Sequence, residues 1–308
     1  MDKIALSAEN LTKIYSKDNS STKNILALNK FNLQVKKGEI FGLLGPNGDV
    51  KTTFINILAG TVIKTSGKDN VWGFDLDENP RQVRANIGIV PQEINFDPFF
   101  SPRKLLELQA GFYGVKQSDR ITDSILETVS LIKQADAYTR SPSGGMKRRL
   151  LIAKAMVHQP PILFLDEPTA GVDVELRQNL WSNVKKLNKL GVTIFLTTHN
   201  LNEAQEMCDR IGIINKGNLV ALDTTQKLLD RIESKKIKFK VKNSNQFEKI
   251  KLDGVKFVKN TSEIIAIYDR SRFKFDQIID AVKNNAEILD ISTDEGDLED
   301  IFLQVTNR

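Results

Sequence analysis

A glycine-rich segment in the first part of the chain holds residues whose types and spacing could bind a polyphosphate. It lies between an apolar run over 39–44 and a helical run over 54–59, and it reads Gly45-Pro46-Asn47-Gly48-Asp49-Val50-Lys51-Thr52-Thr53. In a strand, loop and helix of this kind, backbone N–H groups and the helix N-terminus point at the phosphates. Lys51 would contact the outer phosphates, and the Thr52 hydroxyl would bind Mg²⁺. A glycine-rich turn with an incidental lysine is the structural alternative.

Two adjacent carboxylates, Asp166 and Glu167, follow an apolar run that begins at Ile162. Such a run is typical of a buried strand, and ligands bind at the carboxyl ends of strands in open α/β sheets. Asp166 would then bind Mg²⁺, and Glu167 could polarise a water molecule. Neighbouring acidic residues after a strand are also common in loops, so these two residues alone leave both interpretations open.

The elements that would position these residues alternate between short strands and helices. Apolar strands are predicted at 39–45, 87–92, 162–166, 192–199 and 211–215. Their continuous apolar character is typical of a mostly parallel sheet that is covered on both faces. The first 35 or so residues, and residues 68–74, favour antiparallel strands added at one side. Between them, Ser101 and Pro102 predict a helix start, and a second helix is expected over 121–137.

The composition of the chain changes after Leu229. Beyond it the pattern predicts strands at 235–242 and 263–269, a helix at 275–284, a further short segment at 288–292 and a final helix. Single cores usually stop growing near ~250 residues, so two domains are expected for a chain of 308. We predict a first domain over 1–229, with a helical subdomain at about 93–158, and a small α+β accessory domain over 230–308.

Charge and composition exclude several classes of protein. The net charge is +5, and a basic run over 231–242 holds six Lys or Arg residues and one Glu. Its lysines alternate with Ile237, Phe239 and Val241, which indicates a strand with one solvated face rather than a nucleic-acid surface.

No apolar stretch approaches the ~20 residues of a spanning helix, so a membrane role would need a partner. The one cysteine, Cys208, is expected to be buried and inert, as suits a reducing cytoplasm.

Together these segments resemble the ATP-binding cassettes of ABC transporters, over residues 1 to about 225. The most specific match is Ser143-Gly144-Gly145-Met146, which resembles the signature motif that is nearly private to this family. Tyr15 resembles the aromatic residue that stacks on adenine in this family, and Gln92 resembles the glutamine that senses Mg²⁺ and links to the permease. Asp173 resembles a residue of the loop that crosses the dimer, and His199 resembles the switch histidine.

The resemblance implies an α/β fold, a P-loop NTPase cassette with antiparallel β and helical subdomains, that binds ATP and Mg²⁺. It implies Thr52, Gln92 and Asp166 as metal ligands and Glu167, His199 and Gln92 as catalytic residues. It further implies that the nucleotide is contacted by Tyr15, Gly45, Pro46, Asn47, Gly48, Lys51, Thr52, Thr53, Ser143, Gly144, Gly145 and Asp173. Tyr15 could equally be a strand tyrosine that contacts the core, and Ser143 a plain helix cap.

The same resemblance implies the partners. The cassette would form a head-to-tail dimer that energises export through a separate integral-membrane permease, at the cytoplasmic face of the inner or plasma membrane, without nucleic acid. The segment 296–303 resembles the closing segment of exporter-type cassettes. A soluble ABC protein outside transport is an alternative class, although such proteins usually carry two cassettes or a long coiled coil.

Four positions depart from the family pattern. Asp49 and Val50 replace Ala and Gly in the phosphate loop, Pro142 replaces an apolar residue before the signature, and Asp69 replaces an apolar strand residue. Asp49 adds a carboxylate beside an anion site, and a β-branched residue at 50 would resist an unusual backbone conformation. An ATPase-impaired pseudo-cassette is therefore the second alternative. The other histidine, His158, is expected to interact with the dipole of a helix C-terminus.

Overall fold

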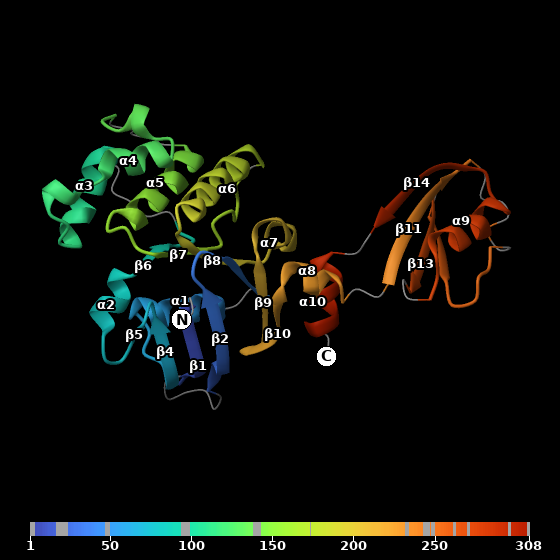
Figure 1. Cartoon of the computed structure of the whole chain (residues 1–308), viewed down its shortest axis with the longest axis horizontal. Helices are drawn as coiled ribbons and strands as arrows, with labels where there is room; N and C mark the ends of the chain where they lie inside the picture. The colour runs from blue at the N-terminus through green and yellow to red at the C-terminus, as the bar shows by residue number, and fades with distance from the viewer. Residues whose placement is uncertain are drawn as a thin grey trace. The chain divides into compact units, whose positions relative to one another are not determined.

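The computed structural model describes most of the chain, drawn as ribbons in Figure 1. The described residues are 4–16, 24–46, 50–93, 99–137, 143–172, 174–231, 234–242, 247, 250–260, 263–269, 272–294 and 297–306. Contacts divide the chain into two compact units, 1–223 and 224–308. The sequence had placed its domain boundary after residue 229. The short helix α8 (Thr225–Leu229) instead belongs to the second unit, where it contacts the last helix.

The first unit is built on a six-stranded sheet. Its strand order is β10-β9-β3-β8-β7-β6, with β3 (Ile40–Leu44), β6 (Ile87–Val90), β7 (Ile162–Asp166), β8 (Thr193–Thr198), β9 (Arg210–Asn215) and β10 (Asn218–Thr224). The pairs that join β6, β7, β8, β3 and β9 are all parallel. Every residue of β3, β7 and β8 is buried. The predicted parallel sheet is therefore confirmed, and the carboxyl ends of β3, β7 and β8 meet at one edge.

A second, antiparallel sheet packs against the same core. Its order is β2-β1-β4-β5, with β1 (Ile4–Tyr15), β2 (Ile25–Lys36), β4 (Ser66–Val71) and β5 (Phe74–Asp75). Helix α1 (Val50–Ala59) lies between the two sheets, because Phe54 contacts Phe31 of β2 at 5.2 Å and Phe195 of β8 at 5.6 Å between ring centroids. This packing fixes the start of α1, directly after the glycine-rich loop.

Buried Asp69 interrupts the apolar character of β4. It is 1% exposed, and its carboxylate binds Lys64 at 3.1 Å, while Lys64 also binds Asp77 at 2.9 Å. Burial raises the pKa of the Asp69 carboxyl, and Lys64 opposes that shift. The strand thus accommodates a carboxylate where the sequence predicted an apolar residue, because a lysine from the preceding loop neutralises it.

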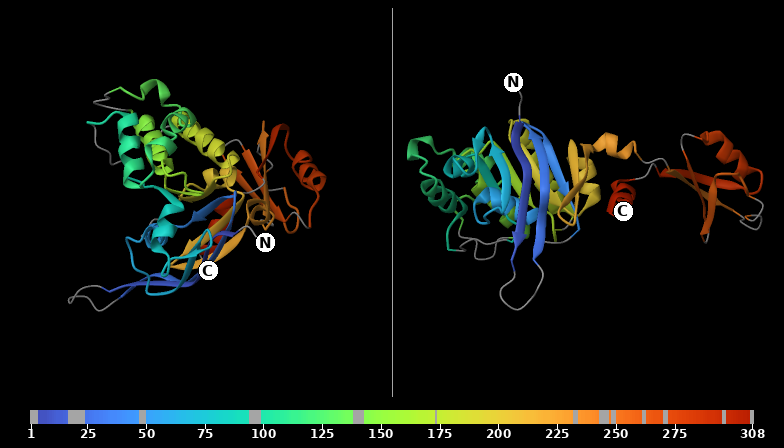
Figure 2. Two further views of the ribbon diagram at one scale, coloured as in Figure 1. Left: turned by 60° about the vertical axis from the view of Figure 1, so that its left-hand side comes forward. Right: turned by 90° about the horizontal axis from the view of Figure 1, so that it is seen from below.

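Further helices complete the unit. They are α2 (Pro80–Ala85), α3 (Pro102–Phe112), α4 (Thr122–Thr128), α5 (Gly144–Met156), α6 (Val174–Lys189) and α7 (Leu201–Met207). Helix α2 lies beside the antiparallel sheet and α7 beside the parallel one. In the left view of Figure 2, the green helices α3, α4 and α5 lie at one end of the unit and the blue strands β1 and β2 at the other. Ser101 caps α3 as predicted, since its hydroxyl accepts a hydrogen bond from Lys104 N at 3.3 Å.

The predicted helix over 121–137 is wrong in its extent. Helix α4 ends at Thr128, and a separate 3₁₀ turn follows at Ile132–Gln134. The break has a backbone cause, because Ser130 adopts a left-handed φ of 57°. Arg149 stabilises that turn by donating a hydrogen bond to Ser130 O at 2.9 Å.

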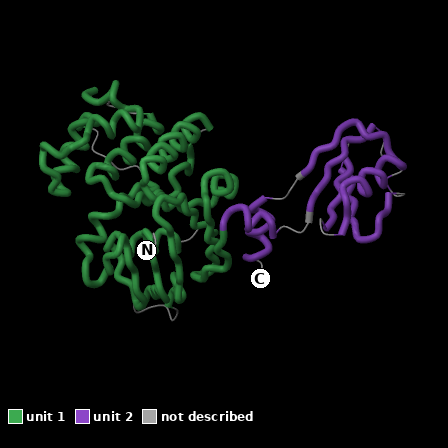
Figure 3. Tube along the Cα trace, viewed as in Figure 1, with its two compact units in different colours: residues 1–223 green, residues 224–308 purple. Residues whose placement is uncertain are grey.

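The second unit, drawn in purple in Figure 3, contains a four-stranded antiparallel sheet. Its order is β12-β13-β11-β14, with β11 (Ser234–Val241), β12 (Lys256–Asn260), β13 (Glu263–Asp269) and β14 (Ile288–Asp294), and its helices are α8, α9 (Phe275–Lys283) and α10 (Leu298–Thr306). The alternation predicted for β11 is confirmed, because Ile237, Phe239 and Val241 are buried. Strand β12 was missed, since four of its five residues are exposed and it lacks an apolar face.

Two further properties of the described residues bear on function. None of their helices combines the length and apolar character needed to cross a bilayer. Cys208 follows α7 and is 6% exposed, and burial raises the pKa of its thiol far above the usual value. The expected buried thiol is therefore confirmed.

Candidate active site

Lys51 lies buried at the start of α1, 2% exposed. Its Nζ donates hydrogen bonds to Gly45 O at 2.8 Å and Pro46 O at 3.3 Å, so the ammonium is held by the backbone that follows β3. Gly45 must be glycine, since a Cβ there would lie 2.6 Å from a side-chain atom of Ile214. Asn47, Gly48 and Asp49 of this loop lie outside the described residues.

Asp166 ends β7 and is held by two hydroxyl groups. Thr52 Oγ1 donates to its Oδ2 at 3.1 Å, and Thr197 Oγ1 donates to its Oδ1 at 2.5 Å. The whole residue is 6% exposed. Thr52 and Asp166 together offer hydroxyl and carboxylate oxygens, which are the ligands that Mg²⁺ prefers. The donor set therefore fits that ion.

Glu167 is the residue on which the predicted site converges. One carboxylate oxygen lies 3.5 Å from Lys51 Nζ, and the other lies 3.4 Å from Gln92 Nε2 and 3.2 Å from His199 Nδ1. Its backbone has a left-handed φ of 44°, and its N–H donates to Thr197 O at 3.0 Å. Non-glycine residues in this conformation are uncommon and cluster at functional sites. Lysine, glutamine and histidine thus surround one carboxylate that is largely buried.

Tyr15 is the last residue of β1. Its hydroxyl is 3.1 Å from Thr53 Oγ1, and Lys13 Nζ lies 4.6 Å from the centre of its ring. The ring is half-buried. Tyr15 therefore contacts α1, which agrees with the alternative of a strand tyrosine that contacts the core. Its stacking on adenine stays a prediction.

The signature residues begin α5. Ser143 caps this helix, with its hydroxyl accepting a hydrogen bond from Met146 N at 3.3 Å. The two glycines differ, because a Cβ on Gly145 would lie 2.3 Å from Leu176 of α6, whereas a Cβ on Gly144 would meet no atom within 4 Å. No hydrogen bond or ion pair in the described part of the chain joins these three residues to Glu167 or Lys51. Pro142 and Asp173 lie outside the described residues.

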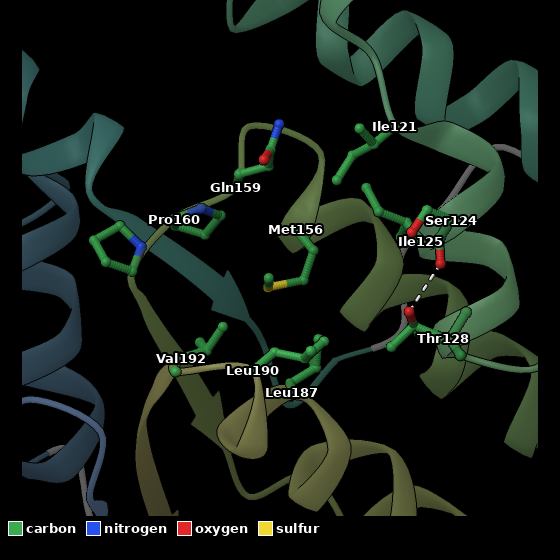
Figure 4. Close-up of a pocket in the computed structure, with 13 residues that line it drawn as sticks. Ile121, Ser124, Ile125, Thr128, Met156, Gln159, Pro160, Leu187, Leu190 and Val192 are labelled. Carbon is green, nitrogen blue, oxygen red and sulfur yellow. Dashed lines mark hydrogen bonds between the residues drawn. The ribbon is translucent and has the colours of Figure 1, made fainter.

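A pocket of about 350 Å³ elsewhere in the first unit has a different character (Figure 4). It is lined mainly by apolar side chains from α4, from the loop after α5 and from the end of α6, and Met156 points into it. It contains none of the residues predicted to bind a nucleotide, and its lining includes no charged group that could bind phosphate.

Comparison with known proteins decides the family. The family model for ABC transporters matches residues 28–170. The linearmycin resistance ATP-binding protein LnrL of Bacillus subtilis (strain 168) is 34% identical over 98% of this chain and 98% of its own length. The chain belongs to the ATP-binding proteins of the ABC transporter family. The Nod factor export ATP-binding protein I of Mesorhizobium japonicum is 32% identical to this cassette, over 99% of the chain and 87% of the relative.

The solved structures agree with the fold of the cassette. The dimeric ATP-binding cassette MJ0796, in a post-hydrolysis state bound to ADP and Pi, superimposes with a TM-score of 0.62 and 27% sequence identity. The match covers 71% of this chain and 98% of that chain. The predicted P-loop fold is thereby confirmed. Members of the family bind ATP, generally with Mg²⁺, and are ATP hydrolases.

Three polar residues of the cassette escaped the sequence analysis. Thr197 holds Asp166, Glu203 of α7 accepts a hydrogen bond from Thr169 at 2.6 Å, and Arg148 of α5 donates to the backbone next to the site. Glu203 and Arg148 are each 5% exposed. Both are charged residues on helices, where a charged side chain is usually expected to face the solvent. Only their burial in the folded chain distinguishes them.

The contacts of His158 give it a role that the sequence did not predict. Burial lowers the pKa of its imidazole, which disfavours the charged form that an interaction with a helix dipole would need. The ring stacks on Tyr113 at 3.7 Å between centroids, and its Nε2 lies 2.9 Å from Ile87 O. His158 therefore joins α3 to the parallel sheet.

Proposed function

We propose that the chain is the ATP-hydrolysing subunit of an exporter. It would work as a head-to-tail dimer, bound to a separate integral-membrane permease at the cytoplasmic face of the membrane. The convergence of Lys51, Gln92 and His199 on Glu167 carries the proposal, because a water-polarising carboxylate beside a phosphate-binding lysine serves hydrolysis rather than binding alone. The relatives matched over most of their length are named for resistance and export, which favours transport over a soluble role.

The proposed roles follow from the contacts. Lys51 would exchange its carbonyl partners for the outer phosphates, since a charge-assisted hydrogen bond is stronger than a neutral one. Thr52, Asp166 and Gln92 would hold Mg²⁺, which when bound neutralises charge on the phosphates. Glu167 would accept a proton from the attacking water, and His199, whose ring is half-exposed, would orient that carboxylate and the terminal phosphate.

The open face of Gly144 supports the dimer. A helix N-terminus with free space beside its first glycine can approach a phosphate group closely, so Ser143 and Gly144 would contact a nucleotide that is bound to the second copy. Gly145 would contribute indirectly, because Leu176 occupies the space beside it. Tyr15 and Asp173 would complete the nucleotide contacts, at the adenine and at the dimer crossing respectively.

Trapping the dimer tests this proposal. Glu167→Gln should form a dimer in size-exclusion chromatography with ATP and Mg²⁺, since it removes the proton acceptor and leaves Thr52 and Asp166 in place. Lys51→Met in the same background should remain monomeric. The proposal fails if the dimer forms equally without nucleotide, or if Glu167→Gln hydrolyses ATP as fast as the parent chain.

A groove of about 440 Å³ would receive the permease. It is lined by residues of α1, α3 and α5 and by Pro91, which directly precedes Gln92. Tyr113 lies in its wall, and the neighbouring Phe112 is 85% exposed. A cytoplasmic segment of the permease seated here would act on Gln92, and through it on Glu167.

Membrane fractionation tests the partner. The chain should sediment with membranes only when it is co-expressed with a polypeptide that has about six apolar 20-residue spans. Phe112→Asp should abolish that association, whereas Leu190→Asp, at a residue that is 74% exposed beside the pocket of Figure 4, should not. Salt-resistant sedimentation of the chain alone with lipid would contradict the proposal.

An ATPase-impaired cassette is the second candidate function. Asp49 favours it, because a carboxylate in the loop repels phosphate. Val50 no longer does so through backbone strain, since it is the first residue of α1 and lies outside the left-handed region. It also packs against the core. Steady-state ATP hydrolysis by the purified parent chain decides between the two candidates.

A further inference from the structure

Arg148 occupies an unusual position for a charged residue. It lies on α5, three residues beyond Gly145, and only 5% of it is exposed. No carboxylate in the described part of the chain forms an ion pair with it, and its Nε is buried without a hydrogen-bond partner. Burial of this kind lowers the pKa of the guanidinium. A charge that is difficult to bury and has only neutral partners suggests a purpose other than stability.

The partners of Arg148 are backbone carbonyls of two loops. One terminal nitrogen donates to Gln92 O at 2.8 Å and to Pro91 O at 3.3 Å. The other donates to Ala170 O at 3.5 Å. The first loop carries Gln92 itself, and the second runs from Glu167 towards α6. One guanidinium therefore joins the loop that carries Gln92 to the loop that carries Glu167, and these two side chains contact each other.

We infer that Arg148 is a positioning residue, which holds Gln92 and the segment 167–170 in register and ties both to the signature helix. This inference rests on the proposed function, because it assigns Arg148 to the hydrolytic reaction. The side chain of Gln92 lies 3.4 Å from Glu167, so a shift of its backbone moves it out of hydrogen-bond range. Arg148 thereby connects the end of α5 that would serve the second copy to the carboxylate of its own chain.

The shape of the guanidinium matters to this role. Its planar fork can donate in fixed directions to two loops at once, whereas a lysine ammonium is a point donor on a flexible stem. Arg148→Lys should therefore keep a positive charge near Gln92 O and lose the bridge to Ala170. Arg148→Met removes all three hydrogen bonds while keeping much of the apolar stem.

Arg149 provides a matched control. It is the next residue of the same helix, burial lowers the pKa of its guanidinium too, and its partners are also carbonyls. Those carbonyls belong to Gly145, Val129 and Ser130, which lie on α5 itself and on the turn after α4. Arg149→Met should thus disturb the helical end of the unit and leave the loops of Gln92 and Glu167 in place.

Hydrogen exchange tests the positioning without requiring any activity. The amides of Glu167, Ala170 and Val172 donate to carbonyls at 3.0, 3.2 and 3.1 Å, so their protection reports on this segment. In the nucleotide-free chain, Arg148→Met should accelerate exchange in peptides over 87–93 and 166–172 by about fivefold or more, as expected for a lost hydrogen bond. Arg149→Met should act on 127–132 instead. Equal exchange in parent and Arg148→Met would overturn the inference, as would equal effects of the two variants on 166–172.

Kinetics then tests the consequence for hydrolysis. Arg148→Met should lower kcat by about 10- to 100-fold while the Kd for Mg-ATP stays within about twofold, because misplacement affects the reacting geometry and not Lys51. Arg148→Lys should recover only part of kcat, and Arg149→Met should stay within about threefold of the parent. In a Gln92→Ala background the loss on Arg148→Met should be smaller, since the two residues act on the same contact.

The two proposals fail in different ways. A parent chain without ATP hydrolysis would overturn the proposed function, and exchange at 166–172 would still decide the positioning role. A parent that hydrolyses ATP, with kcat and Kd falling in parallel in Arg148→Met, would overturn the positioning role alone. Losses that add fully in the Gln92→Ala background would do the same.

Discussion

Two lysines of the first unit lie next to carboxylates, Lys51 buried and Lys64 partly buried, and their partners differ. Lys51 has one carboxylate, Glu167, at 3.5 Å, and donates its short hydrogen bonds to backbone carbonyls. Lys64 has two carboxylates, Asp69 at 3.1 Å and Asp77 at 2.9 Å. The two lysines occupy similar positions, since one begins a helix, the other lies in a loop before a strand, and both have carboxylates nearby.

The difference shows what separates a binding site from a structural ion pair. The charge of Lys64 is neutralised within the fold, so a ligand phosphate would have to displace carboxylates. Lys51 is held mainly by neutral carbonyls, which a phosphate can replace with a gain in electrostatic energy. A buried lysine with incomplete charge compensation is therefore the one to expect at a nucleotide site.

The largest effect is expected from removing Lys64. Lys64→Met should lower the free energy of unfolding by about 3–5 kcal/mol, because it leaves Asp69, which is 1% exposed, as an uncompensated buried charge. Chemical denaturation measures this. The Kd for Mg-ATP, measured well below the unfolding transition, should not change.

A second substitution and a change of pH check the cause. Asp69→Asn added to Lys64→Met should recover part of the stability, since a neutral amide is easier to bury. Burial raises the folded-state pKa of Asp69 above its ordinary value, so lower pH favours the folded, protonated form. The single variant should therefore lose less stability at acid pH than at neutral pH. A loss that is independent of pH and of Asp69 would break the comparison.

Lys51→Met should act on binding instead. We expect the Kd for Mg-ATP to rise by about 30- to 100-fold, or ~2–3 kcal/mol, because one partner of a buried charged contact with phosphate is removed. Isothermal titration measures it. The stability of the free chain should fall by less than in Lys64→Met, since Glu167 keeps Gln92 and His199 as partners. A large stability loss with unchanged affinity would reverse the roles of the two lysines.

Changing the loop beside Lys51 should have a smaller effect. Asp49→Ala with Val50→Gly should lower the Kd for Mg-ATP by about 10-fold, which needs only ~1.4 kcal/mol. Asp49→Ala should give most of it, because Val50 already has helical geometry and the removed carboxylate repels phosphate. Adding Pro142→Leu should change the hydrolysis rate more than the Kd. Equal affinities in the parent and the double variant would show that the loop tolerates Asp49.

The smallest effect concerns His158, which contacts neither Lys51 nor Lys64. Its folded-state pKa is lowered from 6.5, so its contribution to stability is complete above pH 6.5 and is lost as the pH falls through the lower, folded-state value. His158→Phe keeps the stack on Tyr113 and should remove this part of the pH dependence, with a change of about 1 kcal/mol or less at neutral pH. Parallel stability curves for parent and variant between pH 7 and pH 5 would contradict the expectation.

Much of the first unit could be predicted because its signals are local. The apolar runs of β3, β7 and β8 and the cap at Ser101 are written in neighbouring residues. The break after α4 was missed because it depends on Ser130 and on an arginine from a distant helix. Strand β12 was missed because its own residues are mostly exposed.

The candidate site divides in the same way. The spacing of the glycines, Lys51 and the two carboxylates could be recognised in the sequence. The structure adds that Lys51 and His199 both contact Glu167. Asp69 looked like a defect of its strand, because its partner Lys64 lies in the preceding loop and its burial cannot be read from the sequence. The role of Arg148 could not be predicted for a similar reason, since its partners are backbone carbonyls, which every residue has.

The burial of Cys208 has a practical consequence. It is the chain's one cysteine, and its thiol is 6% exposed and resists ionisation, so thiol-directed dyes and spin labels should react with it slowly in the folded protein. A cysteine introduced at an exposed residue such as Leu190 should be labelled almost alone, without first replacing the native one. Distances between two labelled copies could then be followed by fluorescence transfer while nucleotide is added.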